Sequence, residues 1–105
     1  MKNKIVFAGS PDFAVESLQR LYDNPNNEIQ LVISQQDKKR NRNKFSPTAV
    51  KKRAMDLGID VITPQNINDD EVFNLLYRLN TDFNVVVAYG QLIKKRKLDR
   101  FKNKI

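Results

Sequence analysis

Residues 5–12 read I-V-F-A-G-S-P-D, and this stretch sets the expected fold of the 105-residue chain. An apolar run typical of a strand ends at Gly9. Ser10 and Pro11 then form a typical helix start, with Ser as the cap and Pro at the first helical position. Strand and helix patterns continue to alternate along the rest of the chain. We therefore expect right-handed crossovers and an α/β fold, with a parallel sheet of about four strands covered by helices on both faces.

The other strands and helices follow from the spacing of apolar residues. Strands are expected over residues 29–33, 59–62 and 83–88, and the consecutive valines of the last one predict burial on both faces. The helical stripes are Ala14, Leu18, Leu21 and Tyr22; Val50, Ala54 and Leu57; and Val72, Leu75, Leu76 and Leu79. Residues 34–45 are expected to form a polar, basic loop.

The ends of the later helices carry further local signals. Ser46 and Pro47 repeat the cap-and-proline start. Asn68 precedes an acidic first turn and has Glu71 three residues later, the spacing of a capping box. Gly58 follows the second helix, where a left-handed cap is expected.

Composition excludes several kinds of chemistry. The chain has no Cys and no His, which excludes a disulfide, a thiol nucleophile, a Cys-based zinc site and a histidine base. No apolar run approaches the ~20 residues of a membrane span, and no targeting segment is recognisable at the start. With 40% hydrophobic residues, the chain is expected to be a folded, cytoplasmic protein forming one domain or part of one.

A site is expected where parallel strands end. If the first and last strands are neighbours, Gly9 and Gly90 lie in turns that border one crevice. The alternative is that both glycines only permit tight turns. A dinucleotide or nucleoside-triphosphate loop is not expected, because the first turn has a single glycine and Asp12 would oppose an anion.

Charge is uneven, with 19 Lys and Arg against 12 Asp and Glu, a net charge of +7. Five basic residues crowd the loop after the second strand: Lys38, Lys39, Arg40, Arg42 and Lys44. The cluster is either ordinary solvated surface or an arm for a phosphate backbone, and we favour the second interpretation. The acids are scattered over different elements, and none stands out as a catalyst.

Four stretches, in order along the chain, carry a family resemblance. Residues 7–14 (F-A-G-S-P-D-F-A) are similar to the opening F-A-G-T-P-D-F-A of methionyl-tRNA formyltransferases. Residues 34–37 (S-Q-Q-D) resemble the family's T-Q-P-D, and residues 46–51 (S-P-T-A-V-K) its S-P-V-K region, with Arg42 before them at the family's loop arginine. Residues 86–93 (V-V-A-Y-G-Q-L-I) match V-V-A-Y-G-x-I-L. Departures are Asn41 and Asn43 for glycines, and Gln36 and Lys94 for prolines.

The resemblance implies a Rossmann-like domain that transfers a formyl group from 10-formyltetrahydrofolate to the amino group of methionyl initiator tRNA, without a metal. The basic loop would contact the tRNA, chiefly through Arg42. The remaining implied site residues are Ser10, Pro11 and Asp12, lining the active site, and Val87, Ala88, Tyr89 and Gly90, bordering the folate pocket.

The family's catalytic Asn-x-His motif and later Asp lie beyond Ile105. We therefore expect residues 1–105 to be the N-terminal part of the catalytic domain, inactive alone, without its C-terminal half and the following tRNA-binding domain. The alternatives are another folate-dependent formyltransferase and a non-catalytic basic RNA-binding half-domain. A valine-rich last strand with an unpaired edge also predicts self-association.

Overall fold

The computed structural model describes residues 2–40 and 44–87, which form a parallel sheet between two helical layers. The strands of this sheet are β1 (Asn3–Gly9), β2 (Asn27–Ile33), β5 (Val61–Ile62) and β6 (Phe83–Val87). The helices are α1 (Asp12–Asp23), α2 (Ala49–Asp56) and α3 (Asp70–Leu79). A separate antiparallel hairpin contains β3 (Lys38–Arg40) and β4 (Lys44–Ser46).

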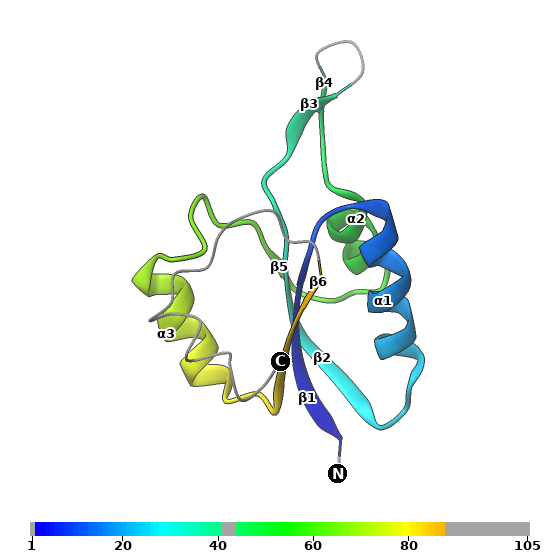
Figure 1. Ribbon diagram of the computed structural model, residues 1–105, viewed down its shortest axis with the longest axis vertical. Coiled ribbons are helices and arrows are strands. Elements are labelled where there is room, and N and C mark those ends of the chain that lie inside the picture. Colours follow the sequence, from blue (N-terminus) through cyan, green and yellow to red (C-terminus); the bar gives the residue numbers. More distant parts are fainter. Residues whose placement is uncertain (1, 41–43, 88–105) are drawn as a thin grey trace.

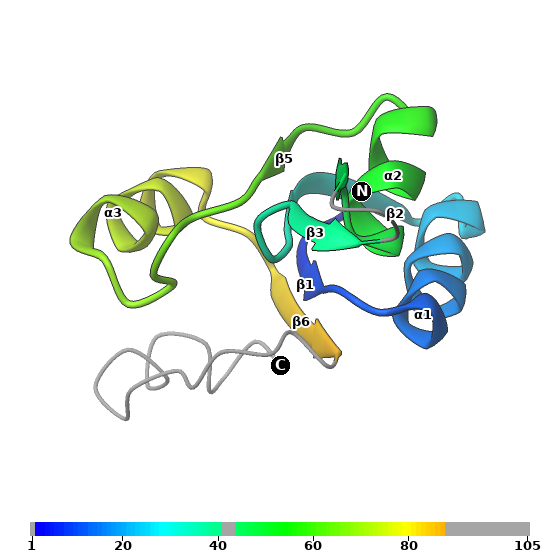
Figure 2. The ribbon, with the colours of Figure 1, turned by 90° about the horizontal axis from the view of Figure 1, so that it is seen from above.

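The strand order is β5-β2-β1-β6, and every pairing in this sheet is parallel. The first and last strands are neighbours, which is the condition on which the expected site depended, and Gly9 lies opposite Val87 at the carboxyl end. Helices α1 and α2 lie on one side of the sheet and α3 lies on the other (Figures 1 and 2). The expected α/β fold with helices on both faces is therefore confirmed.

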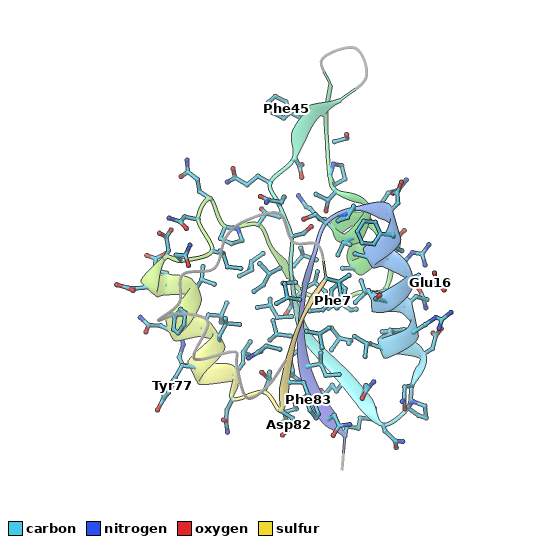
Figure 3. All side chains as sticks on the ribbon, viewed as in Figure 1. Phe7, Glu16, Phe45, Tyr77, Asp82 and Phe83 are labelled. Carbon is cyan, nitrogen blue, oxygen red and sulfur yellow. The ribbon has the colours of Figure 1, made fainter. Side chains whose placement is uncertain are left out.

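Alternation along the strands builds a core on each face. Phe7 and Val32 point toward α1 and α2, where they pack with buried Ala14, Leu18, Val50 and Ala54. The neighbours of Phe7 in β1, Val6 and Ala8, point the other way and pack with Ile67 and with Val72 of α3. Figure 3 shows Phe7 in the middle of the sheet. Two-sided burial explains why β1 reads as a continuous apolar run.

The outer strand β6 is less buried than its sequence predicted. Val85 and Val87 pack against the α1–α2 side and Val86 against the α3 side, yet all three valines keep partial exposure. The reason is position, because β6 pairs with β1 alone among the described residues. Tyr22 and Leu57 are also less buried than expected for members of the apolar helical stripes. The Tyr22 side chain is exposed, and Leu57 is half-buried.

Two helix starts were misplaced by the sequence signals. Helix α1 has Pro11 at its cap, in extended geometry (φ −79°, ψ 172°), and begins at Asp12. Helix α2 is capped by Thr48, whose hydroxyl accepts a hydrogen bond from the Lys51 amide. In each case the proline stays outside the helix.

At the other helix ends, the expected capping box of α3 is wrong and the expected left-handed cap after α2 is confirmed. Helix α3 is capped at Asp69, so Glu71 falls one position too early for the expected capping box, and the Asn68 amide donates to the Asn66 side chain. Gly58 adopts the expected left-handed conformation (φ +74°). Asn80 also turns left-handed after α3 (φ +45°), which the sequence analysis did not anticipate.

Candidate functional site

The carboxyl ends of the parallel strands meet at one edge of the sheet, where ligands bind in open α/β folds. Gly9 lies here at the closest approach of β1, β6 and α1. A Cβ atom at this position would lie 2.8 Å from the Val87 carbonyl oxygen and 3.2 Å from the Ala14 Cβ. Glycine is therefore required for close packing, which gives this turn a structural role beyond conformational freedom.

Ser10 does not cap α1, contrary to the prediction. Its hydroxyl accepts a hydrogen bond from the Gln35 amide at 3.2 Å, and its carbonyl accepts one from the Val50 amide at 3.3 Å. Ser10 thus joins the turn after β1 to the exit of β2 and to the start of α2. Local sequence signals cannot reveal this use, because the partners are 25 and 40 residues away.

Pro11 and Asp12 lie at the same edge as Ser10. Asp12 is exposed in the first turn of α1 and borders a pocket between α1 and α2, together with Ala49, Lys52 and Arg53. Beside it, Phe13 is 68% exposed. Phe13 was not among the expected site residues, because it falls off the buried stripe of α1 and apolar periodicity gives no signal for it.

The predicted polar loop contains the β3–β4 hairpin, which projects from the carboxyl-end edge of the sheet (Figure 1). This hairpin was not predicted, because its strands are short and lack alternating apolar residues. Lys38, Lys39 and Arg40 pair with Ser46, Phe45 and Lys44 respectively. Phe45 is 67% exposed on this hairpin (Figure 3). The chain thus carries four of the five predicted basic residues on the hairpin strands.

Some expected site residues fall outside the described part of the chain. They are Arg42 of the basic loop and Ala88, Tyr89 and Gly90 of the expected folate border. Val87 is described, and it ends β6 directly opposite Gly9. The structure thus brings together Ser10, Pro11 and Val87 at adjacent strand ends, with the basic hairpin rising from the same edge.

Two of the described acidic residues make contacts that hold the fold together. Asp82 accepts a hydrogen bond from the Lys4 amide at 2.8 Å, at the amino end of the sheet, and Asp37 pairs with Lys51. Within residues 2–40 and 44–87, no group of three or more potential ligands is placed to hold a metal ion. The helices of the described segments are also too short or too polar to cross a membrane.

Comparison with known proteins identifies the fold and the family. The formyl transferase family matches residues 2–105. A solved phosphoribosylglycinamide formyltransferase from Anaplasma phagocytophilum superposes with a TM-score of 0.73 at 13% identity, over 100% of this chain and 48% of that one. A glycinamide ribonucleotide transformylase from Symbiobacterium toebii gives 0.68 at 19% identity, over 99% of this chain and 50% of that one.

Sequence relatives give much higher identity. The chain is 90% identical over all 105 residues to a methionyl-tRNA formyltransferase from Finegoldia magna, and covers 34% of its length. It is 45% identical over 96 residues to one from Halothermothrix orenii, covering 90% of this chain and 30% of that protein. The chain spans about a third of the length of these relatives. With the match of residues 2–105 and the shared fold, the chain belongs to the formyl transferase family.

Proposed function

We propose that this chain supplies the N-terminal part of a methionyl-tRNA formyltransferase, which moves a formyl group from 10-formyltetrahydrofolate to the amino group of methionyl initiator tRNA. The 90% identity over the whole chain is the observation that carries this proposal. The basic hairpin projects from the same sheet edge at which Gly9 and Val87 end their strands, and this placement supports the proposal.

In this role the strand ends and the hairpin perform different tasks. Ser10, Pro11 and Asp12 line one side of the crevice, and Val87, Ala88, Tyr89 and Gly90 border the folate. The basic residues Lys38, Lys39, Arg40, Arg42 and Lys44 contact the tRNA, whose phosphates attract an array of cations. Proton transfer and polarisation of the formyl carbonyl require groups that this histidine-free chain lacks.

A chimera tests the proposal directly. Residues 1–105 replace the matched third of the Finegoldia magna relative, and formylation of methionyl initiator tRNA is measured with 10-formyltetrahydrofolate. We expect kcat/KM within about threefold of the parent enzyme, a difference of less than ~1 kcal/mol in transition-state stabilisation. The 105-residue chain alone is the control, and we expect it to show no activity.

Two outcomes would overturn the proposal. One is a folded chimera that fails to formylate the tRNA. The other is a chimera that formylates a ribonucleotide or sugar amine in its place, which would favour a different folate-dependent formyltransferase. Tight tRNA binding by the chain with no activity in the chimera would favour the non-catalytic RNA-binding alternative.

Self-association of the isolated chain is part of the same proposal. Strand β6 pairs on one side only among the described residues, and its valines remain partly exposed. Unpaired strand edges of this kind template association with another strand. We expect light scattering to show an average mass that rises with concentration; a single monomeric mass throughout would contradict the prediction.

A further inference from the structure

The hairpin segment, residues 34–48, is closed at its base by a buried hydrogen bond. The hydroxyls of Ser34, where the segment leaves β2, and Thr48, where it enters α2, are bonded to each other. Their exposures are 0% and 3%. Thr48 also accepts from the Lys51 amide at 3.0 Å, and the Ser34 amide donates to the Ile62 carbonyl at 3.1 Å. Both ends of the segment are thus anchored to the sheet and to α2.

An ion pair spans the same base one step further out. The Lys51 ammonium lies 2.8 Å from the Asp37 carboxylate, and the side chains are 24% and 38% exposed. Asp37 immediately precedes β3, and Lys51 lies in the first turn of α2. The pair therefore ties the outgoing limb of the hairpin segment to a helix packed in the core.

The hairpin needs such support because its own sheet is small. Strands β3 and β4 contain three residues each and form a two-stranded sheet separate from the parallel one. An isolated two-stranded hairpin is at best marginally stable in water. Contacts at its base, where Ser34, Asp37, Thr48 and Lys51 lie, therefore help to fix its direction relative to the strand ends.

We propose that Ser34, Thr48, Asp37 and Lys51 form a base clamp of positioning residues, which directs the basic hairpin toward a tRNA bound at the crevice. The inference rests on the proposed function and adds residues outside the basic cluster to it. None of the clamp residues is proposed to touch the reacting atoms. Weakening the clamp should raise the free-energy cost of ordering the hairpin when tRNA binds, while leaving the rate of formyl transfer unchanged.

Steady-state kinetics of the chimera provide the first test. Combining Ser34→Ala with Asp37→Asn should raise the KM for tRNA about tenfold, with kcat at saturating tRNA and the KM for 10-formyltetrahydrofolate within about twofold of the unsubstituted chimera. The conservative Thr48→Ser, which keeps the hydroxyl, should leave all three values unchanged. Glu16→Gln is the matched control, since it removes an exposed ion pair with Arg20 on α1.

A charge reversal separates the ion pair from other effects of substitution. Asp37→Lys alone should raise the KM for tRNA. Adding Lys51→Asp should bring the KM most of the way back to that of the unsubstituted chimera. An unchanged KM in the Ser34→Ala and Asp37→Asn double variant would overturn the clamp. So would equal losses in kcat and in both KM values, which would indicate general damage. An inactive unsubstituted chimera would instead count against the proposed function.

Limited proteolysis tests the clamp without any assay of function. Trypsin cleaves after Lys and Arg, which are abundant in residues 38–44. In the 105-residue chain, Ser34→Ala with Asp37→Asn should accelerate cleavage within residues 38–44 about tenfold, with cleavage elsewhere unchanged. Glu16→Gln should leave the pattern as it is. Unaltered cleavage of the hairpin in the double variant, with native circular dichroism, would refute the clamp even if the chimera is inactive.

Discussion

The two ends of the parallel strands are held together in different ways. At the amino end, Asp82 and Lys4 exchange two hydrogen bonds of 2.8 Å each, and Asn3 donates to Asn27, all in exposed positions. At the carboxyl end, the hydroxyls of Ser34 and Thr48 are buried and hold a projecting hairpin. The polar contacts of the amino end thus join exposed strand ends, whereas the hydroxyl pair at the carboxyl end is buried at the base of the hairpin.

Gly9 offers the largest perturbation of the carboxyl end. Gly9→Val would place a branched side chain against the Val87 carbonyl and the Phe7 ring. The added Cβ would lie 2.8 Å from the Val87 carbonyl oxygen, which belongs to the backbone and has little room to move. We expect a loss of about 3 kcal/mol or more in the free energy of unfolding, measured by urea denaturation.

Gly58→Ala is the matched control for Gly9→Val. Gly58 is left-handed but has open space around its Cβ position. Only the backbone preference is then lost, which costs about 1 kcal/mol. Equal losses at the two glycines would show that Gly9 is not required for close packing at the strand ends.

The sequence predicted the parallel sheet and both helical layers because the strands and helices follow from apolar periodicity, which does not determine the order of the strands. Phe7, alternating with Val6 and Ala8, already encodes a strand buried on both faces. The helix starts were misplaced because Ser10 bonds to Gln35 instead of capping α1, a partner that becomes adjacent only after folding. The cap of α2 is local, since Thr48 accepts from the Lys51 amide, but Ser46 and Pro47 offer a competing start two residues earlier.

The candidate site was predictable in part. Parallel topology alone places Gly9 and Val87 at one edge of the sheet, and their pairing confirms that juxtaposition. The hairpin and its base clamp were not predictable, because Lys- and Asn-rich strands of three residues carry no apolar pattern. The roles of individual residues in tRNA and folate binding stay predictions from family resemblance.

Arg42 should give the largest functional effect without a loss of stability. Arg42→Ala in the chimera should weaken binding of methionyl initiator tRNA about tenfold or more, because a phosphate or base contact would be lost. Arg20→Ala on α1 removes the same charge at a side chain that is 79% exposed and distant in sequence. Equal effects of the two substitutions in a salt titration would mean that only bulk charge matters.

Asp82 should show the opposite behaviour at the amino end. Asp82→Ala removes the acceptor for the Lys4 amide, which should cost about 1 kcal/mol of unfolding free energy while leaving formylation by the chimera unchanged. Asp23→Ala is a suitable control, because the exposed Asp23 carboxylate accepts a hydrogen bond from the Gln19 side chain of the same helix. A large fall in formylation with Asp82→Ala would contradict the proposal that the amino end affects stability and not formylation.

The smallest expected effects come from two ion pairs, Arg20 with Glu16 and Lys51 with Asp37. Arg20 and Glu16 pair at 2.7 Å with side chains 79% and 70% exposed, whereas Lys51 and Asp37 are less exposed. Solvent screens the first pair, so its coupling energy should be about 0.3 kcal/mol, within the range of exposed helical pairs. The second pair should couple somewhat more strongly, at about 0.5–1 kcal/mol.

Double-mutant cycles by urea denaturation, at low and high salt, measure both couplings. A larger coupling energy for Asp37 and Lys51 than for Arg20 and Glu16 would show that the ion pair at the base of the hairpin contributes more to stability. Equal and negligible couplings would leave Ser34 and Thr48 as the only energetic part of the clamp, since a buried hydroxyl pair keeps its value when salt screens surface charge. The carboxyl end would then differ from the amino end by burial of its hydrogen bonds alone, and not by charge.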